Sequence, residues 1–238
     1  MARVQQPPAP NAPPKAPNPL ELAIYEFEKK AREYHQSLAQ KAPKDETPEQ
    51  TAARRAALQR DLDHLKSERT RIVHMTQIQR QLEEYRERCR NSSPEELARE
   101  PHHPTDDLVI NMAAAGEPKP SPYHDAHHII PGKGRWRQDE IAQARTNLHL
   151  AGIGIQDPQN GVYLPRDKAH KGHWSAPKAP AHKEIHRYNY ETWIFAKFSE
   201  PLPTIAFEAA LLMVKTQLKT GEHPKEILKP KDPAWNGQ

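Results

Sequence analysis

The stretch Asp125-Ala126-His127-His128-Ile129-Ile130-Pro131 predicts a short β-strand over residues 126–130 that ends at the proline. A second stretch, Asn160-Gly161-Val162-Tyr163-Leu164-Pro165, follows a strong turn signal and predicts another strand over residues 162–164. A third, His182-Lys183-Glu184-Ile185-His186, belongs to a helix that we expect to begin at Pro180 and to run to Phe198. Two short strands followed by a helix outline a ββα unit.

The helical stretch carries a histidine pair. His182 and His186 are four residues apart, so their imidazoles project from the same helix face and can share a cation. A zinc peptidase helix would need a glutamate directly after the first histidine to act as general base. Lys183 occupies that position, which argues against a peptidase.

The double histidine predicts a division of labour. Neighbouring residues in a strand face opposite ways, so His127 and His128 should not both bind one cation. One ring can join the cation site, while the other takes a proton from water. A phosphodiester needs charge stabilisation on its oxygens and an activated nucleophile, and one metal with one base meets both demands. The pattern therefore favours phosphodiester hydrolysis.

The asparagine of the second stretch has a structural part to play. In an Asn-Gly turn, the amide of Asn160 can bond to nearby backbone and fix the loop that carries the base. A plain hairpin turn would use the same two residues. Spacing alone leaves both interpretations open.

Further histidines offer an alternative ligand pair. His170 and His173 lie between the asparagine and the helix, but a spacing of three beside a glycine suits a ligand pair less well than His182 and His186 do. His124 is a candidate supporting group, with Asp125 available to hold an imidazole.

Basic residues surround these stretches, as a groove for a polyanion requires. Without an aromatic ladder, a duplex contacted through its backbone is the default substrate. We predict phosphate contacts from Lys133, Arg135, Arg137, Lys171 and Arg187, with Arg166 and Lys168 nearby.

Composition limits what the whole chain can be. It has 25 prolines, 35% hydrophobic residues and a mean hydropathy of −0.97, so one core filling all 238 residues is not expected. Cys89 is the only cysteine, which excludes an intrachain disulfide and a cysteine-based zinc finger. The best apolar run, Ile205 to Val214, is too short for a membrane span and contains Glu208. The N-terminus has no apolar segment of a Sec signal peptide.

Three regions follow from the patterning. Residues 1–19 contain seven prolines and predict a disordered tail. Residues 20–104 predict an accessory helical hairpin, whose second helix begins with the Thr47-Pro48-Glu49-Gln50 capping signal and extends to about residue 90. Residues 105–238 hold the mixed region, with added helices over 136–150 and 204–219. The expected fold class is α+β and mostly helical.

The ordered set resembles the AHH nucleases, a branch of the HNH (His-Me finger) endonuclease superfamily found among bacterial polymorphic toxins. The resemblance rests on Ala126-His127-His128, the Asn160-Gly161-Val162-Tyr163-Leu164-Pro165 turn and the His182…His186 helix followed by Tyr188-Asn189-Tyr190, and it covers residues 121–200. It implies a ββα-metal fold in which His127, His182 and His186 are metal ligands. It further implies that His128 is the general base and that Asn160 orients it.

We therefore expect a metal-dependent DNase with little sequence specificity, acting as an antibacterial toxin. An all-imidazole ligand set favours Zn²⁺ or Ni²⁺ in affinity, and Mg²⁺ could serve in the cell. The resemblance implies an immunity protein as a partner, and residues 1–104 could contact a secretion apparatus. The protein would be made in the bacterial cytoplasm and delivered by a specialised secretion system, without inserting into a membrane.

Two alternatives remain. One is a binding or adaptor protein whose histidines hold a structural metal, with the helical hairpin as its working surface. The other is an RNase on the same scaffold, because nothing in the sequence reads a 2′-hydroxyl.

Overall fold

A computed structural model describes residues 18–238, and it separates the chain into two compact units with the division at Ile78 and Gln79. The predicted tail therefore lies, up to residue 17, outside the described residues. Asn18 and Pro19 already belong to the start of the first helix.

The N-terminal unit is a helical hairpin of α1 (Pro19–Ala39) and the first part of α2 (Pro48–Asn91). At the start of α2, the backbone N–H of Gln50 donates to the Thr47 hydroxyl and the backbone N–H of Thr47 donates to the Gln50 side chain. The predicted capping box is thus confirmed, and so is the hairpin. Leu65 is buried, and a 2.9 Å contact between Lys30 Nζ and His64 Nε2 links the two helices.

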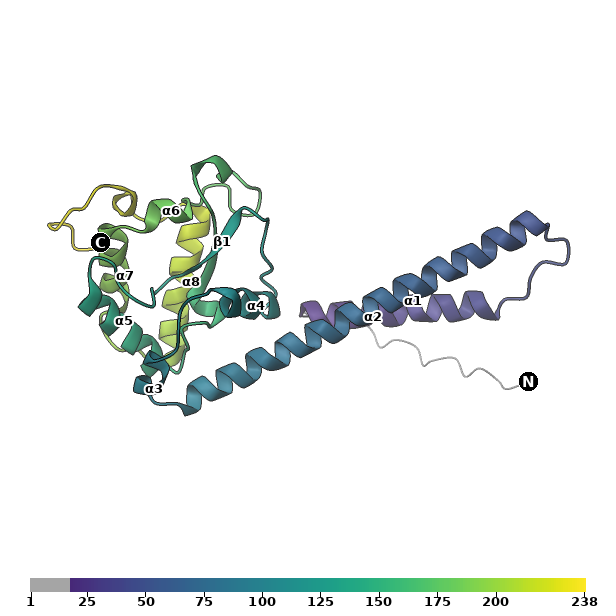
Figure 1. Ribbon diagram of the computed structural model, residues 1–238, viewed down its shortest axis with the longest axis horizontal. Helices are drawn as coiled ribbons and strands as arrows, with labels where there is room; N and C mark the ends of the chain where they lie inside the picture. The colour runs from purple at the N-terminus through teal and green to yellow at the C-terminus, as the bar shows by residue number, and fades with distance from the viewer. Residues whose placement is uncertain (1–17) are drawn as a thin grey trace. The chain divides into compact units, whose positions relative to one another are not determined.

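The C-terminal unit contains the last turns of α2 and all later elements (Figure 1). Its two strands form one antiparallel sheet in which His128 lies opposite Gly161. The described chain is mostly helical with this one small sheet, so the predicted fold class is confirmed. The elements are α3 (Pro94–Ala98), α4 (Asp106–Ala114), β1 (His124–His128), α5 (Gln138–Leu150), the 3-10 turn η1 (Pro158–Asn160), β2 (Gly161–Pro165), η2 (Lys168–His170), α6 (His182–Ile185), α7 (Tyr188–Phe198), α8 (Thr204–Thr220) and η3 (Lys225–Leu228).

The core of this unit lies where α5, α7 and α8 pack against the residues that follow β1 (Figure 1). Each large apolar side chain removed from water there contributes roughly 1.5–3 kcal/mol. The sheet therefore packs against a layer of helices, and this packing fixes the position of the strand ends. The largest fully buried side chains include Trp193, Tyr190, Phe198, Phe207, Ile129 and Ile130.

Both strands begin earlier than predicted. β1 spans residues 124–128 instead of 126–130, because Asn160 and not a strand residue pairs with the chain after His128. The backbone N–H of Ile129 donates to the Asn160 carbonyl, and that of Ile130 donates to the Asn160 side chain. The ladder therefore ends at Gly161.

The predicted continuous helix from Pro180 to Phe198 is wrong. It divides into α6 and α7, with His186 and Arg187 between them in non-helical conformations. In an unbroken helix, the Glu184 carbonyl would accept a hydrogen bond from the backbone of Tyr188. Here Nε of Arg187 donates to that carbonyl instead. The predicted domain boundary also differs, because contacts join the end of α2 and α3 to the C-terminal unit from residue 79 and not from 105.

Candidate active site

A cavity of about 580 Å³ opens beside the end of β1. Its walls come from β1, the loop that follows β1 over residues 131–135, α6, the start of α7, and the segment that runs from residue 102 into α4. Six histidines and one aspartate line it: His102, His103, Asp125, His127, His128, His182 and His186.

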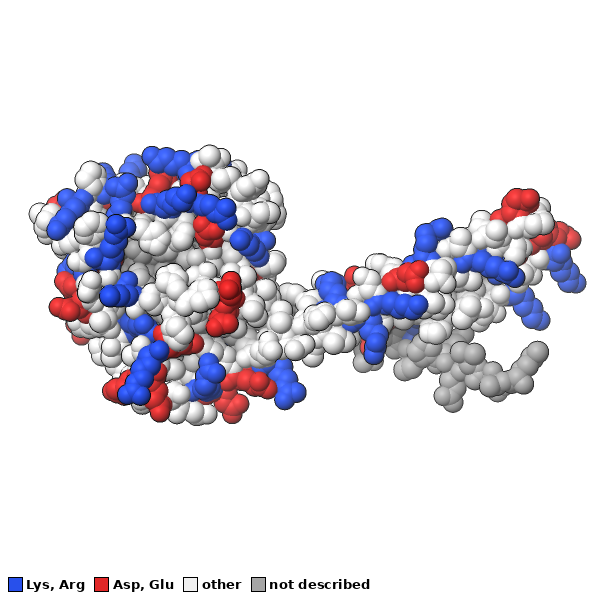
Figure 2. All heavy atoms as spheres, viewed as in Figure 1, with Lys and Arg blue, Asp and Glu red and all other residues white. Residues whose placement is uncertain are grey.

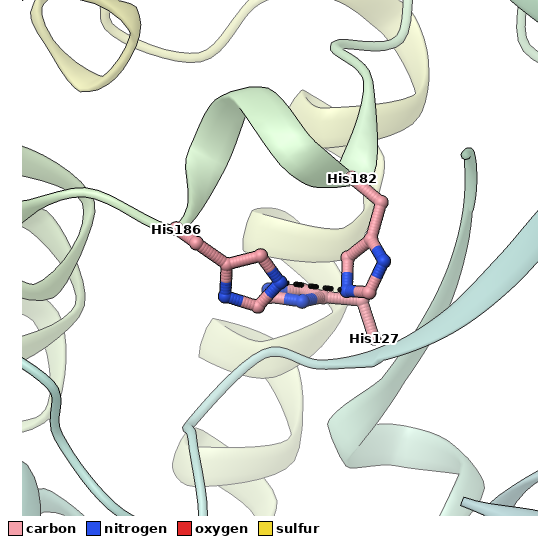
Figure 3. A group of neighbouring side chains, drawn as sticks. All are labelled: His127, His182 and His186. Atoms are coloured by element: carbon pink, nitrogen blue, oxygen red, sulfur yellow. Dashed lines mark hydrogen bonds between the residues drawn. The ribbon is translucent and has the colours of Figure 1, made fainter. Parts of the chain in front are cut away.

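Three histidines meet on one side of this cavity (Figure 3). His127 comes from β1, His182 is the first residue of α6, and His186 directly follows α6. One ring nitrogen from each lies within 4.8 Å of the others, and the Nε2 atoms of His182 and His186 are 2.9 Å apart. The three ligands predicted from the sequence are therefore brought together.

Contacts with neighbouring residues indicate which ring nitrogen of His127 and of His182 can bind a metal. The Tyr190 hydroxyl donates its only hydrogen to the carbonyl of Ile129, so it must accept from Nε2 of His127, 2.9 Å away. This leaves Nδ1 of His127 with a lone pair. In His182, Nδ1 faces Asp125 at 3.5 Å, and this leaves Nε2. Metal-binding histidines are commonly held in this way through their second nitrogen.

These residues fit a divalent cation. Imidazole nitrogens that share a zinc-sized ion at about 2.0–2.1 Å lie about 3 Å apart, as those of His182 and His186 do. Burial lowers the pKa of His127 well below its ordinary range and lowers that of His182 to about 4. Both rings are therefore neutral at pH 7, which is the form that binds metal.

His128 faces away from the cluster, as expected for the next residue of a strand. Its Nε2 lies 3.0 Å from Oε1 of Gln156. The rings of His102 and His103 stand edge-on to it, each with its centroid 6.4 Å away. Burial lowers the pKa of His128 to about 4, so this ring is neutral as well.

Asn160 is fully buried and joins the segment that follows β1 to the segment that precedes η1. Its side-chain oxygen accepts from the backbone N–H of Ile130, and its amide nitrogen donates to the carbonyls of Ile130 and Ile155. The residues after His128 are thereby fixed. It does not form a hairpin turn, since α5 lies between the two strands.

The alternative pair lies elsewhere. His170 contacts Asp167 through Nδ1 at 2.7 Å and stacks on Tyr123, while His173 contacts Ser175. Neither lines the cavity. His124 packs its ring against His173, and Asp125 faces the imidazole of His182.

The predicted phosphate contacts divide into two groups. Lys133, Arg135 and Arg187 line the cavity. Arg137 is instead bonded to Glu140 and Thr192, and Lys171 pairs with Glu184, so these two do not reach it. On the face of this unit that Figure 2 shows, Lys and Arg are interspersed with Asp and Glu.

Sequence reasoning missed four residues that complete the site. Gln156, His102 and His103 were not singled out, and Tyr190 entered only as part of a motif. His102 and His103 form a second double histidine between two prolines, which was a usable signal. Gln156 and Tyr190 gave none, because each meets its histidine only through the tertiary fold.

Comparison with known proteins identifies one part of the chain. Residues 109–201 match the model of a nuclease family of the HNH/ENDO VII superfamily with conserved AHH. No curated protein and no solved structure matches the sequence. The matched segment contains both strands, the three-histidine cluster and His128. The family predicted from the sequence is confirmed for this segment, which supports a nuclease that acts on nucleic acid.

Proposed function

We propose that this chain is a divalent-metal-dependent endonuclease that hydrolyses DNA with little sequence specificity and acts as an antibacterial toxin. One observation carries the proposal: the three-histidine cluster and His128 lie on opposite faces of the same strand end and line the same cavity. A scissile phosphate placed there would meet a cation on one side and a base on the other.

His128 performs the proton transfer in this mechanism. Gln156 engages its Nε2, so Nδ1 takes the proton from a water that attacks phosphorus. A phosphate anion in the cavity favours the charged ring, which raises its pKa from the low value that burial imposes. When held by His127, His182 and His186, a divalent cation would stabilise charge on the phosphate oxygens and on the departing 3′ oxygen.

The ligand set limits the choice of metal ion but does not identify a single one. Three imidazoles favour Zn²⁺ or Ni²⁺ in affinity, while Mg²⁺ would serve where it is abundant. A structural metal site is closed and tolerates the loss of a neighbouring base, whereas a catalytic one keeps an open position. The bordering cavity supports the catalytic assignment.

The cavity walls support a backbone-directed substrate contact. Among residues 18–238, Lys133 forms no ion pair, and the guanidinium group of Arg135 forms no ion pair but lies over the ring of Trp136. Cations of this kind bind phosphates and carry no sequence information. We therefore propose duplex DNA, contacted through its phosphates.

The biological role follows from the family resemblance. The protein would be made in the bacterial cytoplasm, delivered by a specialised secretion system and neutralised in its producer by an immunity protein. Contact with the secretion apparatus would involve residues 1–104. None of the described helices is long and apolar enough to cross a membrane.

Plasmid cleavage by the full chain tests the proposal. Wild type and His128→Ala are compared in EDTA and then after addition of Mg²⁺, Mn²⁺, Zn²⁺ or Ni²⁺, with RNA as a second substrate. We expect metal-dependent nicking of DNA that His128→Ala loses while still binding metal. Cleavage of RNA alone would make the protein an RNase. Intact DNA and RNA under every metal would favour the binding or adaptor alternative.

A further inference from the structure

We propose that Gln156 is a positioning residue that fixes the tautomer of His128, and that the end of α2 holds Gln156 in place. The inference rests on the proposed function, since it concerns the residue assigned as base. It also gives a role to residues that precede the family match.

The contacts of the Gln156 side chain fix the orientation of its amide group. One end of the amide faces the carbonyl of Pro101 at 2.8 Å, and a carbonyl can only accept a hydrogen bond. The NH₂ group must therefore lie at that end. The other end, which faces His128, is the side-chain oxygen.

That oxygen determines the tautomer of His128. An amide oxygen only accepts, so Nε2 of His128 must donate and must carry the ring proton. The neutral ring then has its lone pair on Nδ1. The orientation of one buried amide thus selects the nitrogen that can take a proton from water.

Hydrogen bonds from α4 and α2 hold the backbone of Gln156 in place. Its backbone carbonyl accepts from Nδ2 of Asn111 in α4, and its backbone N–H donates to the hydroxyl of Tyr85 in α2. The Tyr85 hydroxyl in turn donates to Glu100. Both backbone groups and both side-chain ends of Gln156 are thus engaged, and the residue is 2% exposed.

The end of α2 contacts the loop around Gln156 at two further points. Arg86 forms a two-pronged ion pair with Asp157, with contacts of 2.8 and 3.0 Å. Gly154 lies against the Tyr85 side chain so closely that a Cβ would have no room. The Gly154–Asp157 loop therefore cannot shift without moving α2.

The tautomer can be read directly by nuclear magnetic resonance. Long-range ¹H–¹⁵N correlation of the full chain at pH 7.5 distinguishes protonated from unprotonated ring nitrogens, and His128→Gln assigns the signal by removing it. We expect the Nε2–H tautomer for His128 in the wild type. The opposite tautomer, or an equal mixture, would overturn the proposal whether or not the protein cleaves DNA.

Variants test the dependence on Gln156. Gln156→Leu should mix the tautomers and lower DNA cleavage by about 10–100-fold, the range found when a metal-binding histidine loses the group that orients it. Zn²⁺ affinity, measured by calorimetry, should stay unchanged. Gln159→Leu, three residues further along the chain in η1, is the matched control and should keep the wild-type tautomer and rate.

A milder variant covers the case in which Gln156→Leu does not fold. Tyr85→Phe keeps the ring but removes the hydroxyl, which accepts from the Gln156 N–H and donates to Glu100. We expect a smaller loss of cleavage and a partial change of tautomer. An unchanged tautomer and rate in folded Gln156→Leu or in Tyr85→Phe would overturn the inference. Loss of cleavage in every protein including wild type, with the expected tautomer present, would instead defeat the proposed function alone.

Discussion

The hydroxyl of Tyr190 lies 2.9 Å from Nε2 of His127 and receives its hydrogen, because the hydroxyl's own hydrogen goes to the Ile129 carbonyl. A residue 63 positions away therefore decides that His127 presents Nδ1 to the cluster. Tyr190 is almost fully buried and belongs to α7, so the orientation of the ligand His127 depends on this core helix.

Tyr190→Phe should weaken metal binding. The change removes the acceptor for His127 and leaves its Nε2–H without a partner, so the ring is no longer held in one tautomer. We expect Zn²⁺ or Ni²⁺ affinity to fall by about 10–100-fold in calorimetry. Tyr188→Phe, in the same helix but away from the histidine contacts, is the control. Equal affinities for the two variants would contradict the assignment.

Glu191→Gln should destabilise the loop that carries Arg135. The buried Glu191 carboxylate accepts from the backbone N–H groups of residues 135, 136 and 137 at 2.7, 2.9 and 2.6 Å. A glutamine offers one acceptor and turns its NH₂ towards a donor. We expect a loss of about 1–3 kcal/mol in the free energy of unfolding, measured by denaturant titration. Glu140→Gln, which breaks only a more exposed ion pair with Arg137, should cost less than about 1 kcal/mol.

His149 should contribute to a fall in stability below pH 6.5. Its Nδ1 donates to the Ile153 carbonyl, and its Nε2 accepts from Nε of Arg145. Burial lowers its pKa in the folded state to about 4, against about 6.5 in the unfolded chain. Between these values the unfolded state binds more protons, so the free energy of unfolding decreases as pH falls.

Thermal unfolding at pH 7.5 and 5.5 measures this effect. His149 should account for roughly 1 kcal/mol of the loss at the lower pH. His149→Gln keeps a donor and an acceptor but cannot titrate, so its unfolding temperature should depend less on pH in this range. The same acid sensitivity in the variant would assign the effect to other groups.

Chains that begin at residue 79 and at residue 105 should behave differently. The shorter chain loses the Tyr85 hydroxyl, the Arg86 ion pair with Asp157 and the Pro101 carbonyl. We expect the 79–238 chain to unfold cooperatively, and the 105–238 chain to have a clearly lower unfolding temperature or none. Equal unfolding temperatures in calorimetry would place the boundary at residue 104 after all.

Lys133→Ala should weaken DNA binding in a salt-dependent manner. In a His128→Ala background, which prevents cleavage, the slope of log affinity against log salt should decrease by about 1 because one phosphate contact is lost. Lys171→Ala is the matched control, since its ammonium group pairs with Glu184 and does not line the cavity. Equal slopes for the two variants would remove Lys133 from the contact surface.

Local patterns predicted most of the helices and the ordered histidine set. The Thr47 capping box and the two strands near His127 and Val162 depend on residues that are close together in the sequence. Local propensity and the alternation of apolar residues can predict such elements. The short helix α4 went unpredicted, although Thr105 and two acidic residues mark its start. The break after α6 depends on one side chain, Arg187, which replaces a backbone donor, and no periodicity reveals such a choice.

The supporting contacts were beyond the reach of the sequence for another reason. Gln156 meets His128 across 28 residues and Tyr85 across 71. Such pairs depend on how α2, α4 and the sheet pack together, and a polar residue in a turn has no pattern that names its partner. The residues assigned to the chemistry, together with Asn160 and Asp125, could therefore be predicted, whereas Gln156 and Tyr190 could not.

The pairing of β1 with β2 has a chemical consequence of its own. His127 and His128 are identical side chains, and only the alternation of the strand separates them. A slip of one residue would turn His128 towards the cluster and His127 away from it. Gly161 opposes this slip, because a side chain in its place would strike Leu108 and Met112. The register of the hydrogen-bond ladder thus determines which of two identical imidazoles faces the metal-binding cluster and which remains available as the base.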